Sequence, residues 1–420
     1  TATTEIYTLS LHDALPICLV FFDARSAASA PILGSVTVGS QPDMVTFSPD
    51  GTRVLSANEG EPNDEYTVDP EGSVSVIAVP RGVAAPTQTD ARTADFHAFE
   101  TGGTKTLDPM VRVFAGIPGA TNPVSANLEP EYITVDKRTA YVTLQEANAV
   151  AVIDLRTATV DAILPLGFKD LSVAGNGIDP SDRDPCGAPT TNIRNFPGLF
   201  GIYMPDAIAS YRSGGATYLV TANEGDARES GDYVEGARVG DLDVCATSPL
   251  AALTANADLG RLNVTTENGF NEAAGCYDAL YAFGARSFSI WTTSGAQVYD
   301  SGDSLERVTA AAHPAFFNSN HTVSNLEGRS DDKGPEPEGV AIGEIQGRTY
   351  AFIGLERIGG IAVYDVTDPR RTTFVTYVNN RDFSVSVGDA DDTDVALAAA
   401  GDLGPEGVAF IDGRVSPTGK

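Results

Sequence analysis

Apolar and polar residues alternate in many short runs along the chain, and this two-residue period is that of β-strands. The runs are rich in β-branched residues and are bounded by Gly, Pro, Asn and Asp, which favour turns. No segment sustains the 3.6-residue period of a long helix. The sequence therefore predicts an all-β protein.

One pattern returns along the chain. Each copy opens with Pro followed by Asp or Glu, continues through alternating apolar residues, turns at a polar or Gly position and ends in a second apolar strand. Four full copies and one isolated opening occur, at residues 41–60, 129–148, 204–225, 336–357 and 404–413. A further apolar strand often follows a copy. A unit of about four strands that recurs in this way is typical of a β-propeller blade.

The spacing of the copies predicts about seven blades, with six or eight left open. The intervals from Pro42 to Pro130 and from Pro205 to Pro337 each leave room for a divergent blade. We interpret residues 277–303 as one such blade, with Trp291 filling its core. A β-sandwich array is the structural alternative, but it does not explain why the same acid returns at the same strand position.

Long segments rich in Gly, Pro, Asp and Asn interrupt the pattern at about 80–127, 167–203, 226–276 and 304–335. We expect them to be loops on one face of the propeller, where a rigid scaffold presents binding residues.

The two ends of the chain differ from the repeated part. Residues 1–17 resemble a translated sequencing adapter, so we expect this segment to be non-native and the export signal to be absent from the chain. A strand expected at Gly407–Ile411 has no partner strand after it, which indicates a truncated C-terminus. Residues 18–420 contain no linker and are predicted to form a single propeller domain.

The carboxylates of the repeat are the candidate metal ligands. Those of the Pro-acid step are Asp43, Glu131, Asp206, Glu338 and Glu406. Those that close the second strand are Glu59, Glu146, Glu224 and Glu356. Equivalent acids on successive inner strands would surround the central channel, and hard oxygen ligands suit calcium. Asn58 and Asn223 could add amide oxygens.

An alternative role for these acids is structural. They would then cap turns or pair with basic residues, of which the candidates are Arg228, Arg286, Arg329 and Arg357.

The charge balance limits the partners. Asp and Glu number 57 against 27 Lys and Arg, a net charge of −30. Such a chain repels nucleic acid and anionic membranes and favours cations or basic partners, although the charge could also serve solubility alone. No run of about 18 apolar residues occurs, so we expect no transmembrane helix.

The four cysteines, Cys18, Cys186, Cys245 and Cys276, form no CxxC pair, which argues against a zinc ribbon. A disulfide between Cys245 and Cys276 is favoured, although sequence cannot fix the connectivity. A disulfide would suit an extracellular protein.

Signals of catalysis are few. The GDSL tetrapeptide at 302–305 lies in an all-β context, where it does not form the hydrolase motif. The acidic run at 389–394 lacks the Gly and the final Glu of an EF-hand loop and is expected to be solvated. A calcium-dependent phosphoesterase with metal-activated water remains open. Its candidate catalytic residues are Asp226, Arg228 and Arg286, and Lys333 is a further candidate to hold phosphate.

Four segments carry a family resemblance. They are LVTANEGDARESGDYVEGARVGDL (219–242), YAFGARSFSIW (281–291), the run from 329 to 366, and GDLGPEGVAFI (401–411). They resemble the bacterial choice-of-anchor I proteins and the related mesenchyme-specific cell-surface glycoproteins, which are associated with biomineral deposition. The resemblance covers the chain from about residue 19 onward. It implies an extracellular propeller, and many relatives carry the label alkaline phosphatase or phytase-like.

The resemblance also singles out particular positions. They are Glu59, Glu224, Asp226, Arg228, Asp331, Asp332, Glu336 and Glu338. The chain departs from its relatives at GFNEAAGCYD (269–278), where they have an acidic, calcium-loop-like run.

Two hypotheses follow. The first is a secreted or cell-surface propeller that binds calcium and presents an acidic face to a mineral surface or an extracellular protein. The second is a calcium-dependent phosphomonoesterase that acts on a phosphate ester.

Overall fold

The computed structural model describes residues 16–25, 30–63, 65–117, 122–184, 189–231 and 233–418. Cys186 and most of the segment 1–17 lie outside these ranges. The chain divides into two compact units, which are residues 1–166 with 228–234, and residues 167–227 with 235–420. That residues 18–420 form a single propeller domain stays a prediction.

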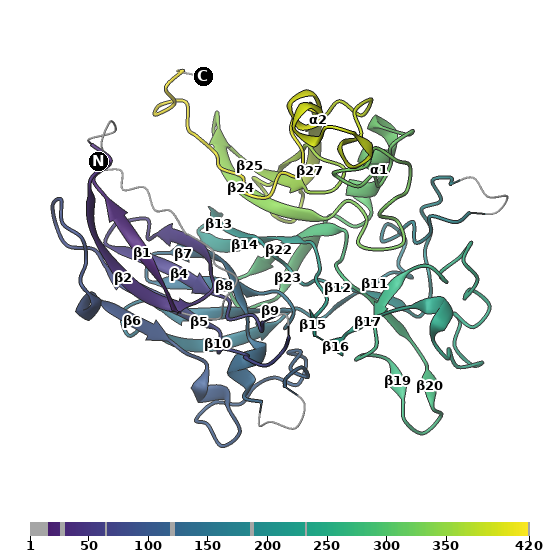
Figure 1. The fold of residues 1–420 in the computed structure, drawn as a ribbon, viewed down its shortest axis with the longest axis horizontal. Helices are drawn as coiled ribbons and strands as arrows, with labels where there is room; N and C mark the ends of the chain where they lie inside the picture. The colour runs from purple at the N-terminus through teal and green to yellow at the C-terminus, as the bar shows by residue number, and fades with distance from the viewer. Residues whose placement is uncertain are drawn as a thin grey trace. The chain divides into compact units, whose positions relative to one another are not determined.

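Unit 1 is built on two four-stranded antiparallel sheets whose strands follow one another in sequence order (Figure 1). The first contains β3 (Pro42–Phe47), β4 (Arg53–Asn58), β5 (Ser73–Ala78) and β6 (Ala91–Ala94). The second contains β7 (Pro130–Asp136), β8 (Thr139–Leu144), β9 (Ala149–Asp154) and β10 (Thr159–Pro165). The described part of the unit also contains two separate two-stranded hairpins. They are β1 (Pro16–Phe22) with β2 (Ile32–Ser40), and β15 (Glu229–Ser230) with β16 (Tyr233–Val234). Its short 3₁₀ helices are η1 (Gln88–Asp90), η2 (His97–Phe99) and η3 (Val124–Asn127).

The inner strands of unit 1 are buried on both faces. Leu55 of β4 joins Val142 and Ile153 of the second sheet in one hydrophobic core. Val54, on the opposite face of β4, packs in a second core with Leu19 and other residues of the β1–β2 hairpin. Because side chains alternate along a strand, one apolar strand supplies both cores.

Unit 2 holds two more sheets of the same four-stranded, antiparallel kind. One contains β13 (Ile208–Ser213), β14 (Ala216–Asn223), β22 (Ser287–Thr292) and β23 (Gln297–Asp300). The other contains β24 (Pro337–Ile345), β25 (Arg348–Leu355), β26 (Ile361–Asp365) and β27 (Thr373–Val378). Its helices are α1 (Ser304–Ala312), α2 (Thr393–Ala399), η5 (Val239–Asp241) and η6 (Val387–Asp389).

Turn chemistry explains the hairpins within these sheets. The two-residue turns Gly214–Gly215 and Gln346–Gly347 have positive φ at both positions. This is the type I′ geometry that matches the twist of paired strands.

Each of the four full copies of the repeat folds into the first two strands of a four-stranded sheet. The predicted all-β propeller class is confirmed. The total of about seven blades stays a prediction.

The segment 277–303 does not form a blade of its own. Its strands β22 and β23 complete the sheet that β13 and β14 begin, with β22 paired to β14. The chain leaves this sheet after β14 and returns to it at residue 287. Trp291 is buried as predicted, and its indole N–H donates to Thr221 Oγ1 at 2.9 Å.

All four of the predicted loop insertions contain regular structure in the described residues, since β6 lies within 80–127 and α1 lies within 304–335. Segments 167–203 and 226–276 contribute to a five-stranded sheet, ordered β11 (Phe168–Asp170), β12 (Leu199–Ile202), β21 (Leu280–Ala282), β18 (Asn263–Thr265) and β17 (Gly236–Arg238). Between β18 and β21 in the sequence, β19 (Phe270–Asn271) and β20 (Cys276–Tyr277) form a short antiparallel hairpin. The predicted disulfide between Cys245 and Cys276 is confirmed.

One expectation for the C-terminal part is corrected. Gly407–Ile411 forms no strand, and Phe410 instead stacks on Phe352 of β25 at a centroid distance of 5.6 Å. The acidic run 389–394 is largely exposed, as expected, and its last two residues begin α2, which the Asp392 carboxylate caps by accepting a hydrogen bond from the Val395 N–H at 3.2 Å.

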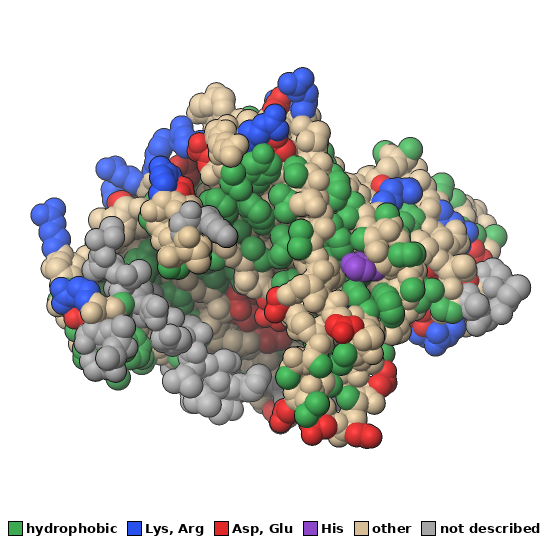
Figure 2. All heavy atoms as spheres, turned by 90° about the horizontal axis from the view of Figure 1, so that it is seen from above, with side chains coloured by type: hydrophobic (Ala, Val, Ile, Leu, Met, Phe, Trp, Pro, Cys, Tyr) green, Lys and Arg blue, Asp and Glu red, His purple; other side chains and the backbone are tan. Residues whose placement is uncertain are grey.

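In the described part of the chain, no helix combines the length and apolarity needed to cross a bilayer. The face drawn in Figure 2 carries acidic, basic and hydrophobic side chains together.

Asn223 links buried strands by its side chain. It accepts from Thr221 Oγ1 at 2.8 Å and donates to Ser287 and Ser289 of β22 at 3.3 and 2.9 Å. Asn58 makes the same contacts with Ser56, Ser73 and Ser75 in unit 1. The amide oxygens expected as ligands are thus engaged within their own sheets.

We expect Asn223→Ala to lower the free energy of unfolding by about 1–3 kcal/mol, because it removes three buried hydrogen bonds, to Thr221, Ser287 and Ser289. Urea denaturation measures this loss. Asn256→Ala, at an exposed position of the same unit, is the control and should change stability by less than about 0.5 kcal/mol. Equal effects of the two substitutions would contradict the structural role of Asn223.

Candidate functional site

A β-bulge follows the proline that opens the repeat in three of its copies. The strand register shifts between Pro42 and Val45, between Pro130 and Ile133, and between Pro337 and Val340. The acid after each proline therefore lies outside the regular ladder, where a bulge changes the direction of its side chain. The residues before Pro42 and Pro337, Gln41 and Glu336, have positive φ values of 48° and 49°.

In unit 1 this arrangement brings three of the predicted ligands together. One carboxylate oxygen each of Asp43, Glu59 and Glu131 lies within 4.8 Å of the others. Asp43 and Glu131 come from the bulges of β3 and β7, and Glu59 directly follows β4. Acids from two successive sheets therefore converge, as the repeat predicted.

A second group forms in unit 2 from Glu338, Glu356 and Glu406, whose oxygens also lie within 4.8 Å of one another. Glu338 is in the bulge of β24, and Glu356 follows β25. Glu406 comes from the C-terminal segment and is exposed. Oε2 of Glu338 is buried, and no donor from the described residues reaches it.

The titration of this second group reflects crowded negative charge. Burial, together with the charges of Glu224, Glu356 and Glu406, raises the pKa of Glu338 to about 9. Burial also raises the pKa of Glu356 to about 7, although the adjacent Arg357 opposes the shift. Carboxyls this close cannot all ionise without a compensating cation or proton.

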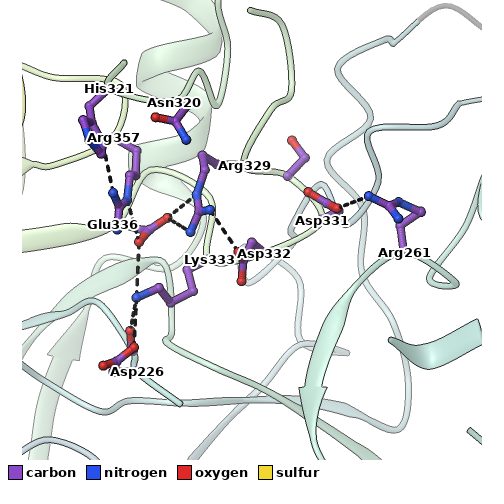
Figure 3. Close-up of polar contacts among 12 residues, drawn as sticks. Asp226, Arg261, Asn320, His321, Arg329, Asp331, Asp332, Lys333, Glu336 and Arg357 are labelled. Atoms are coloured by element: carbon purple, nitrogen blue, oxygen red, sulfur yellow. Dashed lines mark hydrogen bonds and ion pairs between the residues drawn. The ribbon is translucent and has the colours of Figure 1, made fainter. Parts of the chain in front are cut away.

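A buried ion-pair network lies beside this group and is drawn in Figure 3. Its centre is Glu336, the fully buried residue before Pro337. Arg329 and Arg357 approach it at 2.7 and 3.0 Å, and Lys333 Nζ lies 3.3 Å from its Oε2. These three cations lower the pKa of Glu336 against the opposing effect of burial.

Lys333 also forms an ion pair with Glu224, one of the predicted metal ligands. Its ammonium lies 2.7 Å from Glu224 Oε1 and 3.6 Å from Asp226 Oδ1. Glu224, Glu336 and Glu356 lie within metal-ligand reach of one another, but Lys333 already pairs with Glu224 and Glu336, and Arg357 pairs with Oε1 of Glu356 at 2.8 Å. The predicted ligand Glu224 is therefore part of a salt-bridge network, as the structural alternative proposed.

Two predicted ligands do not join any group of three acids in the described residues, namely Glu146 and Asp206. The register explains Glu146. Pro130 pairs with Leu144, whereas Pro42 pairs with Asn58 and Pro337 with Leu355, so Gln145 takes the position that Glu59 and Glu356 hold elsewhere. Asp206 follows Pro205 in a copy whose first strand begins only at Ile208.

The arginines considered for catalysis are engaged in structural contacts. Arg286 is buried, and its two terminal nitrogens donate to Glu306 and to the backbone oxygens of Asp179, Ser330 and Asp332. In unit 1, Arg228 donates to Glu129 Oε2 at 2.5 Å and to the carbonyl of Asn127 at 2.8 Å. These contacts match the structural alternative for the basic residues.

Sequence reasoning missed the central position of Glu336 as an ion-pair residue. The repeat drew attention to the acid after proline, whereas Glu336 lies before it. The signal that could have found it is the cluster of basic residues at 329, 333 and 357 around a Pro-Glu step.

We expect Glu336→Gln to lower the free energy of unfolding by about 3–5 kcal/mol, because it leaves buried cations without their counter-ion. Thermal or chemical denaturation measures the loss. The matched control is Glu344→Gln, at an exposed position of β24, the strand that follows Glu336. Adding Lys333→Met to Glu336→Gln should restore part of the stability, and a strictly additive double variant would contradict the proposed coupling.

Comparisons with known proteins agree with the sequence resemblance. Residues 15–369 match the model of the choice-of-anchor I domain. The mesenchyme-specific cell surface glycoprotein of Strongylocentrotus purpuratus is 30% identical over 295 residues, which are 61% of this chain and 37% of that protein. Gigasin-3a of Magallana gigas is 37% identical over 112 residues, 25% of this chain and 39% of that protein. The chain therefore spans less than two fifths of the length of these curated relatives.

Among solved structures, a periplasmic gluconolactonase of Pseudomonas aeruginosa is similar over 90% of this chain and 82% of its own, with 11% identity and a TM-score of 0.32. The family match is far more extensive than any single motif, since it includes all four full copies of the repeat. The chain belongs to the choice-of-anchor I domain family.

Proposed function

We propose that this chain is a cell-surface or secreted propeller that binds calcium through the carboxylates of its Pro-acid steps. The observation that carries the proposal is the group of Glu338, Glu356 and Glu406, in which a buried Glu338 oxygen lacks a donor from the described residues. A divalent cation would compensate the crowded charge that raises the pKa values of Glu338 and Glu356.

The chemistry of the ligands favours calcium over softer metals. All three side chains offer carboxylate oxygens, which hard cations prefer, and no sulfur or imidazole belongs to the group. The exposed Glu406 comes from a separate segment, so ion binding would also hold the C-terminal segment against the β24–β25 sheet. We expect an affinity of about 10⁻⁴–10⁻³ M, the range of extracellular calcium modules.

The proposal includes an extracellular location and a partner that binds through calcium. One relative is named a cell surface glycoprotein, which supports an extracellular place for this chain. The Asp43, Glu59 and Glu131 group of unit 1 offers a second calcium site with partly exposed ligands. Calcium with open coordination positions at such sites could bridge the protein to a mineral surface or to an acidic extracellular partner.

The phosphoesterase alternative has no observation in its favour. Arg286 and Lys333, the candidates to hold phosphate, donate to Glu306, Glu224 and a backbone oxygen. Catalysis stays a prediction, and turnover of a chromogenic phosphate ester in calcium, abolished by chelator, would test it.

We expect millimolar calcium to raise the melting temperature relative to chelator, because a ligand that binds only the native state stabilises it. Glu338→Gln should remove most of that shift while leaving the protein in chelator at least as stable as the wild type, since Gln carries no charge beside Glu224, Glu356 and Glu406 at any pH. Glu344→Gln is the control and should keep the full calcium response. An unchanged calcium shift in Glu338→Gln would exclude this site.

We also expect stability in chelator to fall as the pH rises. The folded state raises the pKa of Glu338 to about 9 and that of Glu356 to about 7, above the value near 4.5 of a free glutamate. Protonation therefore favours the folded state, and this contribution is complete below pH 4.5 and is lost between pH 4.5 and 9. Melting curves across this range measure it, and the calcium shift should be larger at pH 8 than at pH 5. Melting temperatures that rise over this range in chelator would contradict the assignment.

A further inference from the structure

The strand β27 forms the outer edge of its four-stranded sheet in unit 2. It pairs with β26 on one side, and its backbone makes no hydrogen bond to any other described segment. Its sequence, TFVTYV, contains only β-branched and aromatic residues. Five of its six residues are exposed, among them Phe374, Val375 and Val378 at 43%, 50% and 61%. The edge therefore combines an apolar surface with unpaired backbone groups.

The strands at the same position in the other four-stranded sheets are protected. β6 and β23 have only four residues each, and each contains a charged residue. The longer β10 contains Asp161, and the Lys105 ammonium donates to the backbone oxygens of Val160 and Asp161. Short length and charged side chains keep sheet edges from pairing with other chains. The segment 372–380 around β27, by contrast, has no charged residue.

A β-bulge adds to the exposure of β27. Phe374 pairs with Tyr364 and Thr376 pairs with Val363, so Val375 has no partner residue on β26. A bulge leaves its extra residue outside the ladder. Bulges protect some edges by bending them, but here the extra residue is itself an exposed valine. A second strand would find both backbone groups and apolar contact along this edge.

The two ends of β27 carry opposite charge. Arg370 and Arg371 are exposed and precede the strand, whereas the exposed Asp382 follows it. Arg371 pairs with Asp368 at 3.0 Å, which leaves the charges of Arg370 and Asp382 uncompensated within the described chain. Antiparallel pairing of two identical strands places the basic end of one beside the acidic end of the other, whereas parallel pairing would oppose like charges. The strand is therefore complementary to an antiparallel copy of itself.

Further exposed apolar side chains lie on α2, next to the end of β27 (Figure 1). The Asp382 N–H donates to the Ala400 carbonyl at 2.7 Å and joins the end of this helix to the segment that follows β27. Val395 and Leu397 of α2 are both exposed. A stable interface buries about 1,200–2,000 Å², more than two short strands supply alone. The side chains of α2 can extend the contact.

We propose that β27 is an interface between two copies of this chain, whose β27 strands pair antiparallel about a two-fold axis. The pairing would complete the hydrogen bonds of the outer edge and cover its exposed apolar side chains. It would also set Arg370 of one copy near Asp382 of the other. The uncharged segment keeps the repulsion between two chains of net charge −30 away from the contact itself. Because a two-fold contact closes on itself, association stops at the dimer.

The molar mass of the protein in chelator, measured by light scattering over a range of concentrations, tests the interface. It should rise from the 43.8 kDa of one chain toward twice that value and no further. Val375→Lys and Val378→Lys should each weaken dimerisation at least about tenfold, because the contact would strip water from the lysine. Val173→Lys, at a position of unit 2 that is exposed to nearly the same extent as Val375, is the matched control and should leave dimerisation unchanged.

Two results would overturn the interface: the mass of a single chain at every concentration, or equal dimerisation in the wild type and both edge variants. A mass that continues to grow beyond two chains would exclude the two-fold pairing. None of these residues belongs to the proposed calcium sites, and the measurement contains chelator, so its outcome is independent of calcium binding.

Hydrogen exchange tests the strand pairing directly. Amides of residues 373–378 should exchange at least about tenfold more slowly at a concentration where the dimer prevails than at one where single chains prevail. Amides of β10, the edge that Lys105 already covers, are the internal control and should not change. Dimerisation without protection of 373–378 would place the interface elsewhere and overturn the proposal.

Discussion

The constraint on which the candidate site depends is the β-bulge after proline. It removes one acid from the strand ladder in each of three sheets. In the β3 and β24 sheets this acid lies near the acid that follows the next strand, and Glu131 of the β7 sheet lies near Asp43 and Glu59. Carboxylates placed this way repel one another, and burial strengthens the repulsion because water no longer screens it. The fold tolerates the arrangement only if protons, basic side chains or bound cations compensate the charge.

The two groups of unit 2 show different solutions to the same problem. Glu336 and Glu224 receive their compensation from Arg329, Lys333 and Arg357, whose side chains are largely buried with them. Glu338 lies two residues from Glu336, yet its Oε2 has no donor in the described residues. The protein's own cations therefore make one group a structural network, and the neighbouring group is the one that we propose to bind calcium.

Much of this organisation was accessible from the sequence. Alternating runs and the repeated Pro-acid step predicted the sheets, the burial of Trp291 and the convergence of Asp43, Glu59 and Glu131. Pairing between strands that are far apart in the sequence could not be predicted. The return of β22 to β14 after a long insertion, and the one-residue register difference that places Gln145 where Glu59 lies in another sheet, depend on pairing between distant segments.

The most direct test of the central claim is a count of bound calcium. Equilibrium dialysis against calcium chloride, followed by elemental analysis, should find about one equivalent less calcium on a Glu338→Gln, Glu406→Gln double variant than on the wild-type chain, with Glu344→Gln unchanged. Equal calcium content in the wild type and the double variant would contradict the assignment of Glu338, Glu356 and Glu406 as a cation site.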